Sequence, residues 1–117
     1  MTESRTEYRR ATPLSEAVEE YLERCFAKEQ TPRVSELAVN LGMTRERLSR
    51  DFAAEQGVAL SVYLKQRQLA YAKKLLADST LSTTRIAYRC GFGTRRTFYR
   101  AFRRGTSMSP DEWRRKG

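Results

Sequence analysis

The feature that most constrains this sequence is a helical pattern that occurs twice. The repeated positions are apolar residues, small residues and one glycine, and they pair as Leu37, Ala38 and Gly42 with Ile86, Ala87 and Gly91, and as Leu48, Phe52 and Tyr63 with Phe98, Phe102 and Trp113. The offset is 49 for the first three pairs and 50 for the last three, so the second copy has gained one residue, most simply Gly93. Self-similarity at a fixed period indicates a repeated structural unit.

Each copy has the signals of two short helices separated by a tight turn. Hydroxyl residues that cap helix N-termini and glycines that end helices occur in the order Gly42, Thr44, Gly57, Ser82, Gly91 and Thr94. They predict a short helix over 34–41 in the first copy, and second helices over about 44–55 and 94–104. Two helices joined by a short, glycine-centred turn form a helix-turn-helix unit.

A longer helix precedes the first copy. Thr12 can cap it and Pro13 can occupy its first position. Its apolar residues follow the three-to-four spacing of one buried face, and they are Leu14, Val18, Tyr21, Leu22, Cys25 and Phe26. The outer face is acidic, with Glu16, Glu19, Glu20 and Glu23. This helix is expected to support a core and to point away from any nucleic acid. Residues 1–11 are expected to be a mobile tail or the stub of a linker.

The segment between the copies predicts one long helix over residues 60–78. From Ser61 to Asp78 it has neither glycine nor proline and is rich in good helix formers. Two apolar stripes run along it, one with Leu60, Leu64, Tyr71 and Leu75, and the other, about 120° away, with Leu69, Ala72 and Leu76. A helix with two stripes can pack against two bodies. The 18 residues from Ser61 to Asp78 span roughly 27 Å, which approaches the roughly 34 Å between equivalent grooves of B-DNA.

Positive charge is concentrated in the last third of the chain. Residues 79–117 carry 10 basic and 2 acidic groups, whereas residues 1–43 carry 6 and 8. Residues 85–104 hold seven arginines and no lysine or acidic residue, interleaved with aromatic side chains. The planar guanidinium group suits phosphates and guanine edges. A polyanion partner is therefore the leading expectation.

Composition argues against several other classes. The chain has no histidine and only two cysteines, Cys25 and Cys90, which are far apart, so we expect no metal site and no cofactor. No nucleophile, base and orienting group can be assembled, which argues against an enzyme. No stretch approaches the roughly 20 apolar residues that span a bilayer, and the start lacks a secretion signal. We expect a soluble, cytoplasmic protein with no membrane partner and with both cysteines in its core.

The residues resemble the DNA-binding domain of the AraC/XylS transcription regulators over about 13–115. The matching positions are Leu37-Ala38, Gly42-Met43, Leu48, Phe52, Gly57, Tyr63-Leu64, Arg67, Ala72, Leu75-Leu76, Ile86-Ala87, Gly91-Phe92, Phe98, Phe102, Ser109-Pro110 and Trp113-Arg114. The resemblance implies an all-α fold in which two three-helix, homeodomain-like helix-turn-helix subdomains share a long linker helix. It also implies that each second helix enters the major groove, and that transcription is regulated, usually activated, through RNA polymerase.

One position departs from the family's pattern. The family usually has glycine three residues before Pro110, where this chain has Ser107, and Gly105 lies two residues earlier. The departure predicts that the second recognition helix ends early or turns differently. Arg103 and Arg104 are then weaker candidates for DNA contact.

Two routes select the side chains that face DNA. Counting 100° per residue from the core positions, the opposite side holds Glu46, Arg50 and Ala53 in the first recognition helix and Arg96, Arg100 and Arg103 in the second. The resemblance implies contacts from the N-terminal part of each helix, namely Arg45, Glu46, Ser49, Arg50, Arg95, Arg96, Tyr99 and Arg100. Among the arginines, the two routes agree on Arg50, Arg96 and Arg100, which can pair with guanine. Glu46 can accept from a cytosine amino group or repel phosphate.

The expected organisation is a tail (1–11), a first subdomain (12–59), the linker helix (60–78) and a second subdomain (79–117). The leading function is sequence-specific binding of double-stranded DNA in transcription control, with a monomer covering about 20 base pairs. A dimer is possible if a companion domain is missing. The alternative is a basic helical adaptor that binds protein or RNA, for which the acidic first helix offers a surface. The target promoter, the effector and the choice between activation and repression stay open.

Overall fold

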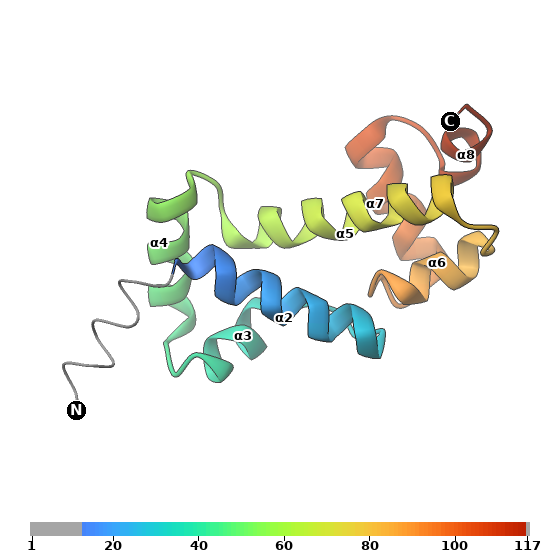
Figure 1. The fold of residues 1–117 in the computed structure, drawn as a ribbon. Coiled ribbons are helices and arrows are strands. Elements are labelled where there is room, and N and C mark those ends of the chain that lie inside the picture. The colour runs from blue at the N-terminus through green and yellow to red at the C-terminus, as the bar shows by residue number, and fades with distance from the viewer. Residues whose placement is uncertain (1–12, 117) are drawn as a thin grey trace.

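The computed structural model describes residues 13–116, and within that range it is entirely α-helical (Figure 1). Its helices are α2 (Leu14–Lys28), α3 (Val34–Asn40), α4 (Arg45–Gln56), α5 (Leu60–Asp78), α6 (Thr83–Arg89), α7 (Arg95–Thr106) and α8 (Pro110–Lys116). The prediction of an all-α fold with a long central helix is confirmed. The predicted tail (1–11) and the predicted cap at Thr12 lie outside the described residues.

Two hydrophobic cores lie side by side along α5. The first is built from α2, α3, α4 and the N-terminal part of α5, and it consists of Val18, Tyr21, Leu22, Cys25, Leu37, Ala38, Leu48, Phe52, Leu60 and Leu64. The second is built from the C-terminal part of α5 with α6, α7 and the turn between them, and it consists of Ala72, Leu76, Ile86, Ala87, Cys90, Phe92, Phe98 and Phe102. The long helix is therefore a shared wall of both cores, as its two stripes predict.

The assignment of individual α5 residues to the two cores differs from the prediction. Tyr71 and Leu75 share a stripe with Leu60 and Leu64, yet they pack against the second core. The two cores pack on successive lengths of α5. Which core an α5 residue joins therefore depends on its position along the helix axis as well as on the face of the helix where it lies. The Tyr71 ring also lies 4.7 Å from the Phe26 ring of α2, measured between centroids.

The duplication is visible in the backbone. At the end of the first helix of each unit, Met43 N–H donates to Ala38 at 2.9 Å, and Phe92 N–H donates to Ala87 at 2.9 Å. The ring pairs behind the recognition helices correspond too, with Phe52 and Tyr63 centroids 5.2 Å apart and Phe102 and Trp113 centroids 5.7 Å apart, both edge-on. The two units therefore share one hydrogen-bond plan and one packing plan.

The predicted N-terminal caps of three helices are confirmed. Thr44 Oγ1 accepts from Arg47 N–H at 3.1 Å, Ser82 Oγ accepts from Arg85 N–H at 3.1 Å, and Thr94 Oγ1 accepts from Thr97 N–H at 3.0 Å. Each bond satisfies a backbone donor that the helix itself leaves unpaired.

The start of α2 differs from the prediction by one residue. Pro13 lies just before the helix instead of at its first position. The Glu55 side chain of α4 accepts the first two N–H groups of the helix, from Leu14 at 3.0 Å and from Ser15 at 3.1 Å. A carboxylate at this end also interacts favourably with the positive end of the helix dipole.

The predicted disturbance at the end of the second recognition helix is wrong. Helix α7 continues through Gly105 to Thr106 and stops at Ser107, whose φ of 64° is left-handed. Gly57 ends α4 in the same way with a φ of 74°. The hydrogen bond from Ser107 N–H to the Arg103 carbonyl, 2.8 Å, holds the turn. A serine thus takes the conformation that glycine adopts more easily, at a local energetic cost.

Glu19 does not belong to an outer acidic face. Its carboxylate accepts two hydrogen bonds from the Arg67 guanidinium of α5, each at 2.9 Å, and one from the Tyr63 hydroxyl. The hydrogen bonding from Arg67 lowers the pKa of Glu19 below its ordinary value, against the opposing effect of burial. Helix periodicity places Glu19 beside its acidic neighbours, but a cationic partner 48 residues away draws it into the α2–α5 interface.

The two halves also touch away from α5. The Arg85 guanidinium of α6 forms a two-pronged salt bridge with Glu29 at the end of α2, at 2.8 and 2.6 Å. Gly91, in the turn after α6, has a φ of 78°, and a Cβ there would lie 2.6 Å from the Gln30 carbonyl oxygen. The salt bridge and this close approach form a second connection between the halves. We call it the α2–α6 bridge.

Candidate nucleic-acid interface

Each recognition helix turns one face to a core and leaves the opposite face open. Leu48 and Phe52 in α4 are fully buried, as are Phe98 and Phe102 in α7. We call the opposite side of each helix its reading face. This division follows from the three-to-four spacing of the buried residues.

The predicted contact residues of α4 line its reading face and N-terminal turn. Arg45, Glu46 and Arg50 are exposed, and Ser49 is half-buried. Within the described chain, no hydrogen bond or ion pair engages the Arg50 guanidinium. Arg47, on the flank of the helix, pairs instead with Asp51 at 3.5 Å. An unpaired guanidinium keeps all its donors available for an external acceptor.

The predicted contact residues of α7 fall into two groups. Arg96 and Arg100 are exposed, and neither has a hydrogen-bonded or ionic partner in the part of the chain that the structure describes. Arg95 and Tyr99 are engaged with the protein itself. Tyr99 hydrogen bonds to Asp111 of α8, and Arg95 donates to the Tyr99 hydroxyl at 2.9 Å while its guanidinium lies 4.1 Å from the ring centroid.

The structure thus separates residues that helix spacing alone cannot separate. Sequence reasoning missed the pairing of Tyr99 with Asp111, because the two residues lie 12 positions apart on different helices. Arg95 further approaches Asp111 at 3.9 Å, although both side chains are about half-exposed. These contacts tie α7 to α8 and hold the Arg95 guanidinium over a ring.

Charge differs sharply between the two recognition helices. The α4 sequence holds three arginines and three acidic residues, whereas the α7 sequence holds five arginines and no acidic residue. All five α7 arginines are exposed. A dense field of exposed guanidinium groups attracts polyanions and steers their approach.

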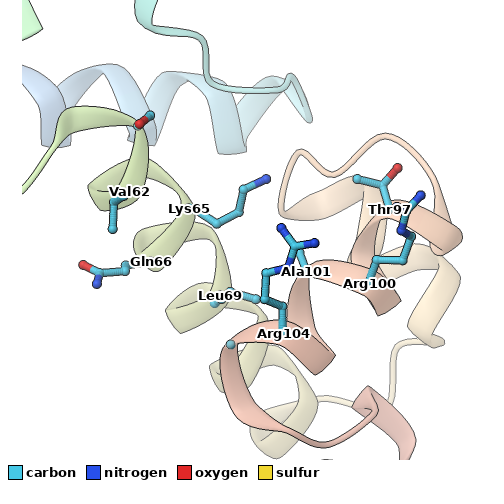
Figure 2. A pocket seen from close by; sticks show the side chains of 10 residues that line it. Val62, Lys65, Gln66, Leu69, Thr97, Arg100, Ala101 and Arg104 are labelled. Atoms are coloured by element: carbon cyan, nitrogen blue, oxygen red, sulfur yellow. The ribbon is translucent and has the colours of Figure 1, made fainter.

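Sequence reasoning also missed a groove beside α7. It lies between α7 and the N-terminal half of α5, with a volume of about 590 Å³ (Figure 2). Lys65 of α5 and Arg100 and Arg104 of α7 are among its lining residues. The predicted role of the long helix is to pack against two bodies, and no cation of α5 is among the predicted DNA contacts.

Three further findings on the described residues concern metal binding, the cysteines and membranes. No cluster of three or more histidine, cysteine or acidic side chains there has the arrangement of a metal site. Both cysteines are buried, and burial raises the pKa of the Cys90 thiol to about 12, far from the thiolate form. None of the described helices is both long and apolar enough to cross a bilayer.

Comparison with known proteins supports the geometry. Residues 37–116 match the model of a helix-turn-helix domain family. Among curated proteins, the chain is 35% identical over 83 residues to the HTH-type transcriptional regulator Rv1931c of Mycobacterium tuberculosis, covering 71% of this chain and 32% of that protein. It is 36% identical over 67 residues to the HTH-type transcriptional activator RhaR of Salmonella heidelberg, covering 57% of this chain and 24% of the relative. The chain thus spans a third or less of these relatives.

Solved structures agree over most of the chain. The DNA-binding domain of AdpA, a global transcriptional factor crystallised with a target DNA, superposes with a TM-score of 0.79 and is 31% identical; the match covers 89% of this chain and 91% of that domain. The C-terminal domain of AraT, a response regulator of Geobacillus stearothermophilus, gives a TM-score of 0.81 at 26% identity, covering 91% and 87%. Duplicated units, shared helix, family match and superposition agree: the chain belongs to the AraC/XylS family of helix-turn-helix domains.

Proposed function

We propose that this chain binds double-stranded DNA sequence-specifically by inserting α4 and α7 into adjacent major-groove segments, and that it thereby regulates transcription. The observation that carries the proposal is the pair of matching units on one helix, each with an open reading face. Helix α5 has 19 residues and a length of about 28 Å. That length is close to one turn of B-DNA, about 34 Å. The AdpA domain, which superposes well, was crystallised on a target DNA.

The open arginines are the proposed base contacts. Arg50 in α4 and Arg96 and Arg100 in α7 would each pair with the O6 and N7 atoms of a guanine, the commonest specific contact in protein–DNA complexes. Arg45, Glu46 and Ser49 would contact DNA around Arg50. Arg95 and Tyr99 would face DNA from a fixed position, since both are bonded within the protein. Such positioned groups suit phosphate contacts, which set register more than sequence.

The wider role is also a proposal. The chain would act in the cytoplasm as a binding protein and not as an enzyme, and would activate transcription through RNA polymerase, in keeping with the activator name of RhaR. It would bind one asymmetric site of about 20 base pairs as a monomer, and a companion domain could make it dimeric. Residues 12–59 and 79–117 would form the two DNA-binding subdomains, with 60–78 between them.

Selection of binding sites from random duplexes tests the proposal. The expected result is two short preferred sequences separated by about one helical turn, one for each recognition helix. An equal-length single-stranded RNA, titrated at physiological salt, serves as the control for simple charge attraction. Tighter binding to RNA than to any duplex, or the absence of duplex preference, would support the basic adaptor instead and refute this function.

A further inference from the structure

The groove between α5 and α7 has cationic side chains on both walls. Val62, Lys65 and Leu69 line it from α5, and Arg100, Ala101 and Arg104 line it from α7. Figure 2 shows Lys65 and Arg104 extending from opposite walls toward the space between the helices. Within the described residues none of the three cations has a hydrogen bond or an ion pair. The Lys65 amine lies 5.5 Å from the Phe92 ring centroid, a contact that holds the amine without neutralising it.

The first unit provides an internal control for this groove. There, α2 packs on α4 as α5 packs on α7. At the offset of 50, Ser15 corresponds to Lys65, and Glu55 corresponds to Gly105. In the first unit the Glu55 carboxylate accepts the N–H groups of Leu14 and Ser15 and so joins α4 to the start of α2. At equivalent positions, the first unit therefore has an acidic side chain, Glu55, whereas the second unit has Gly105 beside a cationic groove.

The groove lies on one flank of the reading face of α7. Counting about 100° per residue from Phe98, Arg100 stands near 200° and Arg104 near 240°, while Ala101 turns further toward α5. A major groove about 12 Å wide holds a helix about 10–12 Å in diameter, so a sugar–phosphate backbone runs along each flank of an inserted helix. Cations on this flank therefore meet phosphates when α7 is seated.

We propose that Lys65 and Arg104 hold a backbone phosphate of DNA in this groove, so that the long helix is part of the DNA interface. The inference rests on the proposed function, because it requires α7 in a major groove. Since α5 runs from the end of α4 to the second core, the phosphate belongs to the stretch between the two half-sites. A contact to phosphate fixes register and carries no direct sequence information.

Neutralising Lys65 tests the proposal, with Lys74 as a matched control. Lys74 is also exposed on α5, but it lies nine residues away and about 180° around the helix. We expect Lys65→Ala to weaken binding to the selected duplex and to random duplex by the same factor, about fivefold, and to reduce the salt slope of log K by about 0.9. Lys74→Ala, which removes the same charge, should change both affinities by less than about twofold.

Phosphate ethylation locates the contact. In the wild-type complex, ethylation of one phosphate between the half-sites should weaken binding. Both Lys65→Ala and Arg104→Ala should lose the interference at that phosphate and keep it at the others. Identical ethylation patterns in wild type and Lys65→Ala, together with displacement of DNA by free inorganic phosphate, would assign the groove to a small anion and overturn the proposal. A changed base preference in Lys65→Ala would also overturn it.

The two proposals fail separately. If the wild-type chain selects no duplex, the proposed function is wrong. If it selects a duplex and Lys65→Ala behaves like Lys74→Ala, only the phosphate contact on α5 is wrong.

Discussion

The two recognition helices have the same length and the same type of cap, but they differ strongly in net charge. Both have 12 residues and begin after a threonine, and both bury two large side chains completely. Yet α4 has no net charge, with three basic and three acidic residues, while α7 has a net charge of +5. Buried positions therefore fix the scaffold, and exposed positions have diverged independently of it.

This difference suggests a division of labour on DNA. Non-specific attraction grows with the number of phosphates that cations neutralise, so α7 would supply most of the electrostatic affinity. Glu46, an exposed acidic residue of α4, penalises any pose in which a phosphate comes close to it. The first unit would therefore contribute more to discrimination than to attraction.

The largest expected effect tests whether the two cores contribute equally to the free energy of unfolding. Phe52→Ala and Phe102→Ala each remove a fully buried ring from its core. Each should lower the free energy of unfolding by about 3–5 kcal/mol, measured by urea denaturation followed by circular dichroism. Because both cores share α5, each variant should unfold in one transition. A probe of helix content and a probe of the tyrosine environment should therefore report the same unfolding curve. Two separated transitions would show that the units fold independently.

The next effect compares the two reading faces. Arg50→Ala and Arg100→Ala should each abolish preference at one base pair of a different half-site, a loss of about 1–3 kcal/mol in discrimination. Binding-site selection with each variant measures this directly. Arg24→Ala on the exposed side of α2 removes the same charge and should leave every preference intact. Loss at both half-sites from one substitution would contradict separate reading by α4 and α7.

A smaller effect concerns the ends of the recognition helices. Ser107→Gly should raise the free energy of unfolding by about 0.5–1 kcal/mol, because glycine adopts the left-handed conformation of this residue without strain. The reciprocal change Gly57→Ser should lower it by a similar amount. Thermal denaturation of both variants compares the two turns. If Ser107→Gly is neutral or destabilising, the serine is not strained there.

The smallest effect is the pH dependence that Glu19 gives to the first unit. Because the pKa of Glu19 is lower in the folded chain than its ordinary 4.5, its contribution to stability is complete above about pH 4.5. That contribution is lost as the pH falls toward the folded-state pKa. Glu19→Gln should flatten the stability curve in that window. The corresponding position in the second unit is Leu69, which cannot titrate. An unchanged acid limb in Glu19→Gln would exclude this ion pair as its source.

Local features were predictable from the sequence. The caps at Thr44, Ser82 and Thr94, the glycine turns and the bounds of most helices depend on residues within a few positions of one another. Their patterns are complete in a single stretch of chain. The duplication also predicted that the two units have matching cores, because the spacing of the apolar residues in one copy recurs in the other.

Features that depend on distant partners were not predictable. Helix spacing placed Glu19 on an outer face, but Arg67 and Tyr63 draw it inward. Gln68 is nearly fully buried, and its amide donates to the Cys90 carbonyl at 2.9 Å, a bond that no pattern along α5 indicates. Tyr99 shared the predicted DNA-contact set with Arg100, and only its bond to Asp111 separates them.

The α2–α6 bridge has a consequence for rotational phase along a duplex. One inserted base pair turns everything beyond it by about 36° and shifts it by about 3.4 Å. If α5 were the sole connection between the two halves, the second half could follow such a change through twisting of that helix. With the Glu29–Arg85 salt bridge and the close approach of Gly91 to Gln30, torsion would have to break a second attachment. The molecule would therefore discriminate between targets by the rotation between their two half-sites as well as by the distance between them. It would reject a target whose half-sites are out of rotational phase.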